Sequence, residues 1–200
     1  MIVMTALAFA VFQGETAECE IRIAVEQQAV TRVGLTCPSA VTDAAGLQAY
    51  ADQVAAAFQT PLDLPPLQVI GVSSTVNFTG SGQGWSLREP ALFLSSAPDY
   101  PERAARRGVE ARCDLRIQVS AGGAAGEIEA VCQSFRPNGA AVRQSGFEDA
   151  AVEAASRHRW FAPLDPERRC ALDSFTFELG DGEGDRPHLE RPVAEAPQCP

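Results

Sequence analysis

The chain of 200 residues contains no lysine, two histidines and no long hydrophobic run. Its 16 basic residues are all arginines, and 26 acidic residues give a formal net charge of −10. Nucleic-acid binding depends on clustered positive charge, and the one local cluster consists of Arg103, Arg106, Arg107 and Arg112. We interpret this cluster as the solvated face of a helix, so nucleic acid is not the expected partner.

The six cysteines lack the spacing of a metal site. There is no Cys-x-x-Cys motif, and two histidines are too few to complete a zinc site with them. Asp181, Glu183 and Asp185 alternate as in a calcium loop, but the terminal bidentate acid is missing at the required distance. We therefore expect no metal and no cofactor. The cysteines favour disulfides and an oxidising compartment.

No set of residues has the composition of a catalytic site. His158 stands between two arginines at the end of a predicted helix, where an imidazole caps carbonyl groups or packs, and His188 lies in the C-terminal tail. The glycines from Gly122 to Gly126 lack the lysine of a phosphate-binding loop. The chain is predicted not to be an enzyme.

The N-terminal apolar run, from Met1 to Phe12, has the length of a signal-peptide core and is too short to span a membrane. Residues 1–17 are a candidate signal peptide with cleavage after Ala17. No basic residue precedes the run, and Glu15 occupies a position where a small residue is expected. A missed upstream start codon or a first strand that is never cleaved would each explain both departures.

Hydrophobic periodicity in the second half predicts two helices and three strands. Pro101 suits the first turn of a helix, and Gly108 suits a left-handed helix stop. Apolar and polar residues alternate in the strands, and apolar residues recur on one face of the longer helix. The predicted elements are a helix over 100–108, a hairpin of 113–119 and 128–132, a helix over 147–158 and a strand over 175–179.

This order of elements, with several uncommon residues at fixed places, resembles the C-terminal domain of TonB-family proteins. The resemblance covers about 80 positions, which is less than half of the chain. Its residues are Pro98-Asp99-Tyr100-Pro101, the Gly108 helix stop, the glycine-turn hairpin, the Phe147–Ala154 helix, Trp160-Phe161-x-Pro163 and the final Phe175-x-Phe177 strand.

The resemblance implies protein binding in the periplasm or cell envelope of a Gram-negative bacterium. In that family the domain binds the N-terminal peptide of an outer-membrane receptor by strand addition, beside a Gln-Pro-x-Tyr-Pro stretch. Pro98, Tyr100 and Pro101 match this stretch, whereas Ala97 replaces the glutamine and removes a side-chain donor and acceptor. Helix entry and core packing are the alternative roles for Tyr100 and Pro101.

The last strand is the expected binding edge. A three-stranded sheet leaves one strand edge unpaired, and such edges accept an extended peptide. The candidate edge residues are Phe175, Phe177 and Leu179. Family members that transmit force also have an N-terminal membrane helix and a long proline-rich span, whereas the 14 prolines here are scattered. Force transmission by this polypeptide alone is therefore not expected.

The first half reads as a degenerate copy of the second. Residues 19–25 match 113–119 in residue type, and 33–37 match 128–132. Leu47, Ala51, Val54 and Phe58 form a helical stripe, followed by a strand at 76–78. We therefore predict an α+β fold with two tandem TonB C-terminal-like units, each a hairpin, a helix and a third antiparallel strand.

The cysteine positions within each repeat predict one disulfide per hairpin. One cysteine begins the outgoing strand and the other ends the returning strand on the same face, so pairing in each hairpin brings them opposite each other. This predicts Cys19 with Cys37 and Cys113 with Cys132. Cys170 and Cys199 are left to pair by elimination, with free thiols or an intermolecular bridge as equal alternatives.

The predicted organisation is a repeat unit over 18–80, a linker over 81–97, the TonB-like domain over 98–180 and a polar tail without regular structure over 181–200. The expected function is a periplasmic module that binds a protein partner, in connection with energy-dependent outer-membrane transport. The alternative is an exported structural protein whose two repeats pair as a closed pseudo-dimer and which has no transport role.

Overall fold

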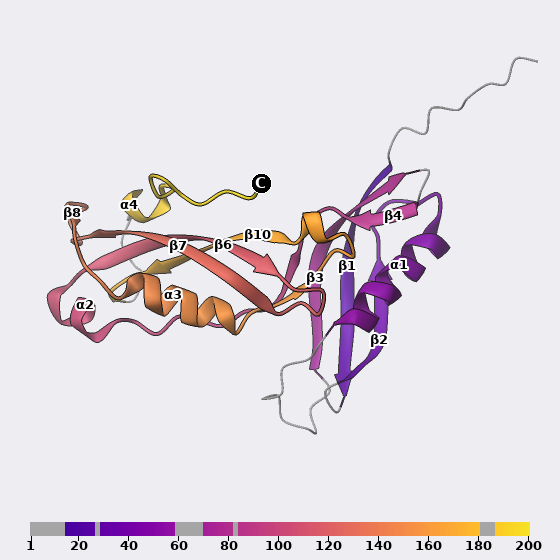
Figure 1. The fold of residues 1–200 in the computed structure, drawn as a ribbon, viewed down its shortest axis with the longest axis horizontal. Helices are drawn as coiled ribbons and strands as arrows, with labels where there is room; N and C mark the ends of the chain where they lie inside the picture. The colour runs from indigo at the N-terminus through magenta and orange to yellow at the C-terminus, as the bar shows by residue number, and fades with distance from the viewer. Residues whose placement is uncertain (1–14, 27–28, 59–69, 82–83, 181–186) are drawn as a thin grey trace, which may run out of the picture.

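A computed structural model describes residues 15–26, 29–58, 70–81, 84–180 and 187–200. The chain forms two four-stranded antiparallel sheets, each accompanied by a helix that follows its hairpin (Figure 1). The strands of the two sheets run in different directions (Figure 1). The predicted α+β fold class is confirmed.

The first sheet has the strand order β2-β1-β3-β4. Its elements are β1 (Glu15–Glu26), β2 (Ala29–Thr36), α1 (Ala44–Ala57), β3 (Ile70–Ser81) and β4 (Gly84–Leu87). Asp43 caps α1, because its side chain accepts a hydrogen bond from the Gly46 N–H. The helix buries Leu47 and Val54 against Ile21 and Phe78 of the sheet.

The second sheet has the order β10-β6-β7-β8. Its region contains α2 (Glu102–Arg107), β6 (Glu110–Val119), β7 (Ala125–Phe135), β8 (Ala141–Val142), α3 (Phe147–Ser156) and β10 (Cys170–Phe177). Gly108 ends α2 at φ 62°, in the left-handed conformation that glycine adopts without strain. Phe147 and Ala151 of α3 pack on Leu115 of β6.

The segment expected to be a linker, 81–97, contributes a strand to the first sheet and a strand to a separate two-stranded sheet. It contains β4 and β5 (Ala91–Leu94), and β5 pairs with β9 (Arg159–Phe161) from the second half. Leu87 and Phe93 are buried in the first core. These apolar side chains draw the segment onto the first sheet, because burial removes them from water and strand pairing satisfies the backbone.

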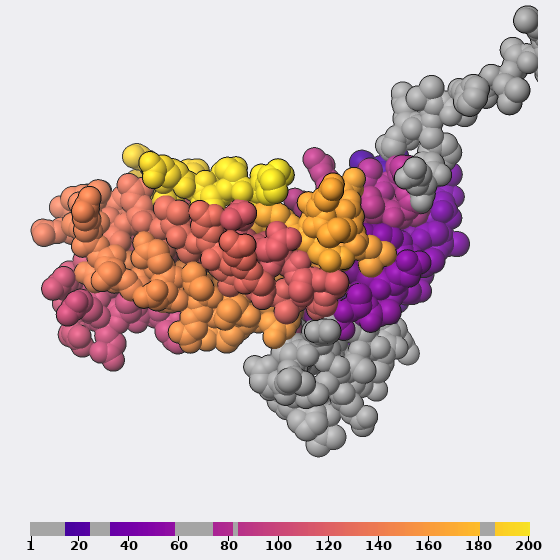
Figure 2. Space-filling view, in the orientation of Figure 1, coloured from indigo at the N-terminus to yellow at the C-terminus, as the bar shows by residue number. Residues whose placement is uncertain are grey.

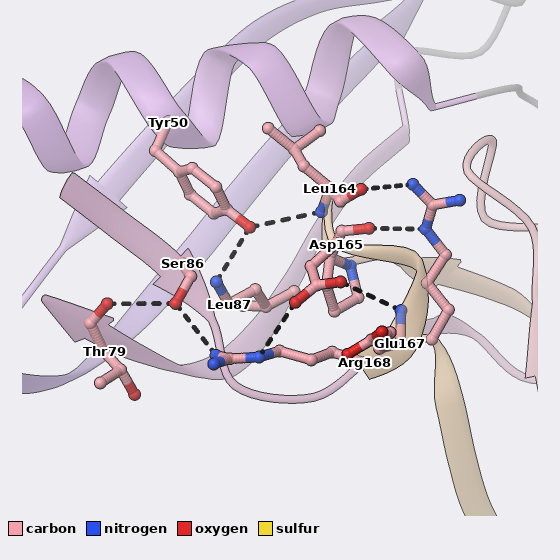
Figure 3. A network of polar contacts seen from close by, with 10 residues as sticks. Tyr50, Thr79, Ser86, Leu87, Leu164, Asp165, Glu167 and Arg168 are labelled. Carbon is pink, nitrogen blue, oxygen red and sulfur yellow. Dashed lines mark hydrogen bonds and ion pairs between the residues drawn. The ribbon is translucent and has the colours of Figure 1, made fainter. Parts of the chain in front are cut away.

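The halves are joined by side chains of the second half that enter the first core. Phe161 is fully buried there, and Leu164 packs on the same cluster. The Tyr50 hydroxyl accepts hydrogen bonds from the Leu87 N–H at 2.9 Å and from the Leu164 N–H at 3.4 Å (Figure 3). One tyrosine of α1 therefore joins β4 to the segment after β9.

A second set of polar contacts lies beside Tyr50. Arg168, in the 3-10 helix η1 (Pro166–Arg168), donates to the Ser86 hydroxyl at 3.1 Å, and Ser86 donates to the Thr79 carbonyl (Figure 3). Arg168 also lies 3.4 Å from Asp165, which caps η1. The connection between the halves is thus formed by both apolar and polar contacts.

We expect Tyr50→Phe to lower the free energy of unfolding by about 2 kcal/mol, because two backbone N–H groups lose their common acceptor. The measurement is chemical denaturation followed by circular dichroism. Gln53→Ala, on an exposed position of the same helix, is the control and should change stability by less than about 0.5 kcal/mol. Equal stability of Tyr50→Phe and the control would contradict the bridging role.

The C-terminal segment docks on the second sheet, which corrects the expectation of a tail without regular structure. It contains α4 (Pro187–Glu190), and Leu189 and Val193 are buried. These two apolar residues provide the driving force for docking that a purely polar tail would lack. Figure 2 shows the segment in yellow along one side of the second half.

Polar contacts hold the docked segment to β6. Arg112 donates hydrogen bonds to the Leu189 and Glu190 carbonyls, and the Val193 N–H donates to Asp114 at 2.8 Å. His188 Nε2 lies 3.3 Å from the carboxylate of Glu110, which is fully buried. Arg112, grouped by sequence with the solvated arginines of α2, is instead a structural contact.

Three disulfides are present, and their pairs are Cys19–Cys37, Cys113–Cys132 and Cys170–Cys199. The two predicted hairpin pairs are confirmed, and for Cys170 and Cys199 the structure has the intramolecular pair, which was one of the alternatives left open. The first two each link the hairpin of their own sheet, and the third attaches the C-terminal segment to the start of β10. Cys113 and Cys132 are direct partners in the β6–β7 register, as the alternation of the two strands requires.

The apolar run Met1–Phe12 lies outside the described residues. Glu15, Thr16 and Ala17 belong to β1, where Ala17 is buried and pairs with Phe78. Cleavage after Ala17 would therefore remove the beginning of a paired strand. None of the helices within the described ranges is long and apolar enough to cross a membrane.

Candidate functional site

The outer edge of β10 is the candidate site, because β10 is the terminal strand of its sheet. The Arg169 carbonyl accepts from Val119 of β6, whereas the Ser174 N–H donates to the side chain of Asp173. Backbone groups in an antiparallel pair alternate in direction, so odd-numbered residues face β6. Leu172, Ser174 and Thr176 direct their N–H and C=O groups outward, and no strand among the described residues pairs with them.

The predicted edge residues differ from these three. Phe177 is 2% exposed in the core, and Phe175 is half-buried with its ring centroid 5.5 Å from that of His158. Leu179 follows the end of β10, and its N–H donates to Glu110. Sequence reasoning placed the last strand at 175–179, whereas β10 is Cys170–Phe177. It chose the side chains that form the core, because only those show a strong apolar alternation.

Leu172 is the residue that sequence reasoning missed. It is the one large hydrophobic residue found exposed in the described part of the chain, at 54%. Its sequence signal was an apolar residue at a position whose parity differs from that of Ala171 and Phe175. An exposed leucine on an open edge provides apolar surface next to backbone groups that no described strand pairs with.

The Pro98–Pro101 stretch meets the other end of β10. The Tyr100 ring contacts Phe177 and Phe147 edge-on, at centroid distances of 5.8 and 5.9 Å, and its hydroxyl donates to the Val109 carbonyl at 2.7 Å. Pro101 is the N-cap residue of α2, and Pro98 is half-buried. The structure thus brings this stretch beside the last strand and gives Tyr100 a packing role there.

In the first sheet, the third strand along the chain, β3, has a partner strand on each side. It pairs with β1 on one side, and β4 pairs with its last residues, Phe78–Ser81, on the other. The two sheets therefore differ at the position where a partner strand could add, and only the second sheet leaves its third strand at the end of the order.

Two hollows open beside the start and middle of β10. One, of about 540 Å³, is lined by the loop Arg88–Pro90, by Arg168 and by Cys199. The other, of about 390 Å³, lies between β10 and the C-terminal segment, where Pro192, Ala196 and Pro197 line it. Leu172 lines both hollows.

His158 is a buried packing residue. It lies between α3 and β9, is 1% exposed, and its Nε2 is 3.2 Å from the Ser96 carbonyl oxygen. Its Nδ1 is 3.3 Å from Asp173 Oδ2, but these atoms are not aligned for a hydrogen bond. No group of three or more potential metal ligands occurs in the part of the chain that the structure describes, and Asp181, Glu183 and Asp185 lie outside it.

These features define a small α+β domain whose third strand can accept another strand at its edge. Residues 96–179 match the Gram-negative bacterial TonB protein C-terminal family, so the second half of the chain is a TonB C-terminal domain. The match does not extend to the first half. No curated protein and no solved structure matches the chain.

Proposed function

We propose that this chain is a TonB-like protein-binding module that binds an extended segment of a protein partner by adding it as a strand to β10. The observation that carries the proposal is the row of outward backbone groups at Leu172, Ser174 and Thr176, on a terminal strand. The family membership of the second half supports an N-terminal segment of an outer-membrane receptor as the partner. The module then contributes to energy-dependent outer-membrane transport.

The proposed location is the periplasm or cell envelope of a Gram-negative bacterium. The matched family is that of the C-terminal part of a Gram-negative bacterial protein, TonB. The three disulfides support an oxidising compartment, because cytosolic thiols are kept reduced. A signal peptide within residues 1–17, cleaved ahead of the strand that begins at Glu15, is part of this proposal.

We infer that the first half is a diverged copy of the second, with unit boundaries at 18–80 and 98–180. In support, the hairpin and third strand follow the order β2-β1-β3 in one sheet and β7-β6-β10 in the other. Each hairpin carries a disulfide at the corresponding place, and a helix precedes each third strand. The copies differ at this strand, since β4 pairs with the end of β3 at Phe78–Ser81, whereas no described strand pairs with the outer side of β10.

The alternative, a closed pseudo-dimer with a structural role, has less support. A closed pseudo-dimer requires that β3 and β10 both have a partner strand on their outer sides. Within the described residues, no strand pairs with the outer side of β10. The halves meet through β5, β9 and the Tyr50 contacts, not through β3 and β10. A binding role uses the edge that this arrangement leaves accessible.

The proposal is tested with an NMR titration of the isotope-labelled protein by outer-membrane receptor N-terminal peptides. We expect amide shifts along β10, largest at the outward residues. Ser174→Pro removes one outward N–H and places a ring at the edge, so the peptide affinity should fall by at least about tenfold while the fold is retained.

Ser174→Ala is the matched control, because it removes the hydroxyl but keeps the backbone N–H. Its affinity should stay within about twofold of the wild type. Equal affinities of the proline and alanine variants, or shifts confined to β2 or β7, would contradict strand addition at β10.

A further inference from the structure

We propose that the C-terminal segment is one wall of the peptide groove and that Leu172, together with this wall, selects an apolar side chain of the added strand. This inference rests on the proposed strand addition at β10 and specifies what the groove recognises. The wall consists of residues 192–198, which face β10 across the hollow of about 390 Å³.

The position of Leu172 places it next to an added strand. Side chains directly opposite each other on adjacent strands lie about 4.5–5.5 Å apart at their Cβ atoms. The backbone N–H and C=O of Leu172 point away from β6, and its side chain is 54% exposed. A side chain of the added strand on the same face of the sheet would therefore contact the Leu172 side chain directly. That partner side chain then lies between Leu172 and Pro197 at the hollow.

The charges around the hollow disfavour an anionic guest. Arg112 and Asp114 both line it, but their side chains are 3.0 Å apart and already paired with each other. Each also binds the backbone of the C-terminal segment, Arg112 at the Leu189 carbonyl and Asp114 at the Val193 N–H. The other charged residue of the lining is the carboxylate Asp173. An anionic guest would be desolvated there without a free counter-charge, whereas an apolar guest gains by burial.

The wall is held in place at both ends. At one end Leu189 and Val193 are buried against the sheet, and at the other end the Cys170–Cys199 disulfide ties the segment to the first residue of β10. The disulfide lies close to the outward residue Leu172, because Cys170 precedes Leu172 by two positions in β10. Fixing the wall in this way lowers the entropy lost when a peptide binds.

The test uses the full chain and a set of receptor N-terminal peptides in which each residue in turn is replaced by leucine or by glutamate, with affinities measured by fluorescence anisotropy. In the wild type we expect one peptide position to prefer leucine over glutamate by about tenfold or more. Leu172→Ala should reduce this preference to within about threefold. Cys170→Ser combined with Cys199→Ser, which frees the wall, should reduce it as well.

Thr176→Ala is the control, since Thr176 is outward on the same strand but lines neither hollow. It should keep the preference of the wild type. If no position shows the preference, or if either the Leu172 or the double cysteine variant keeps it, the inference is overturned. Amide shifts along β10 in the same samples would then still support strand addition, whereas absent shifts overturn strand addition and the inference together.

Discussion

Phe161→Ala is expected to lower the free energy of unfolding by about 3–5 kcal/mol and to affect the first half more than the second. Phe161 lies in β9 of the second half, but its ring is fully buried in the core of the first sheet. Truncation leaves a cavity in this core, since the close-packed surroundings collapse only in part.

The two tryptophans allow the halves to be followed separately. Trp85 packs on the first core and Trp160 is buried in the second, so Trp160→Phe and Trp85→Phe each leave one fluorescent reporter. Without further substitutions, both reporters should show one common unfolding transition, because Phe161 of the second half is buried in the core of the first. In Phe161→Ala the Trp85 transition should move to a lower denaturant concentration than the Trp160 transition.

Phe147→Ala is the comparison, because Phe147 is equally buried but lies in the second core. It should shift the Trp160 transition by a similar free energy. If Phe161→Ala leaves the Trp85 transition unchanged, the second half does not stabilise the first, and the shared core has no energetic role.

Replacing Cys113 and Cys132 by alanine is expected to destabilise the second sheet by about 3 kcal/mol. The disulfide closes a loop of 19 residues between adjacent strands, and in the chain-entropy model a loop of about this length contributes about 3 kcal/mol by restricting the unfolded chain. This is a large part of the stability of a small domain. The measurement is urea unfolding of the double variant with Trp160 as the reporter.

The corresponding double variant of Cys19 and Cys37 provides a matched test, since its loop of 18 residues is almost the same length. Loss of this disulfide should lower the free energy of unfolding of the first half by a similar amount, measured with Trp85 as the reporter. Destabilisation of less than about 1 kcal/mol in both variants would show that the hairpins are held by packing and strand pairing alone.

Much of the fold follows from local patterns. Alternation placed Cys113 and Cys132 on one face, and hairpin pairing made them neighbours, so their disulfide was predictable without tertiary information. Gly108 marked the end of α2 for the same local reason, since glycine adopts the left-handed conformation at low cost. The strand that carries the candidate edge was located only in part, because it was predicted over 175–179 and β10 is Cys170–Phe177.

The candidate site was less predictable, because it depends on which neighbours a residue lacks. Phe175 and Phe177 stood out by hydrophobicity, yet that property puts them in the core and turns their backbone groups toward β6. Leu172 became a candidate only once the sheet order placed β10 at the end. Period-two alternation gives the face of a side chain but not whether another strand lies alongside.

The sequence by itself determined the two hairpins, the helix that follows each of them, the α+β class, the hairpin disulfides and the relationship of the second half to the TonB C-terminal domain, because these depend on periodicity, turn residues and local spacing. Only the tertiary structure decided that β4 pairs with the end of β3, that β10 stays at the edge, that Phe161 enters the first core and that the C-terminal segment docks beside Leu172. These features depend on contacts between residues far apart in the chain, for which the local pattern of apolar residues allows several equally well-buried arrangements.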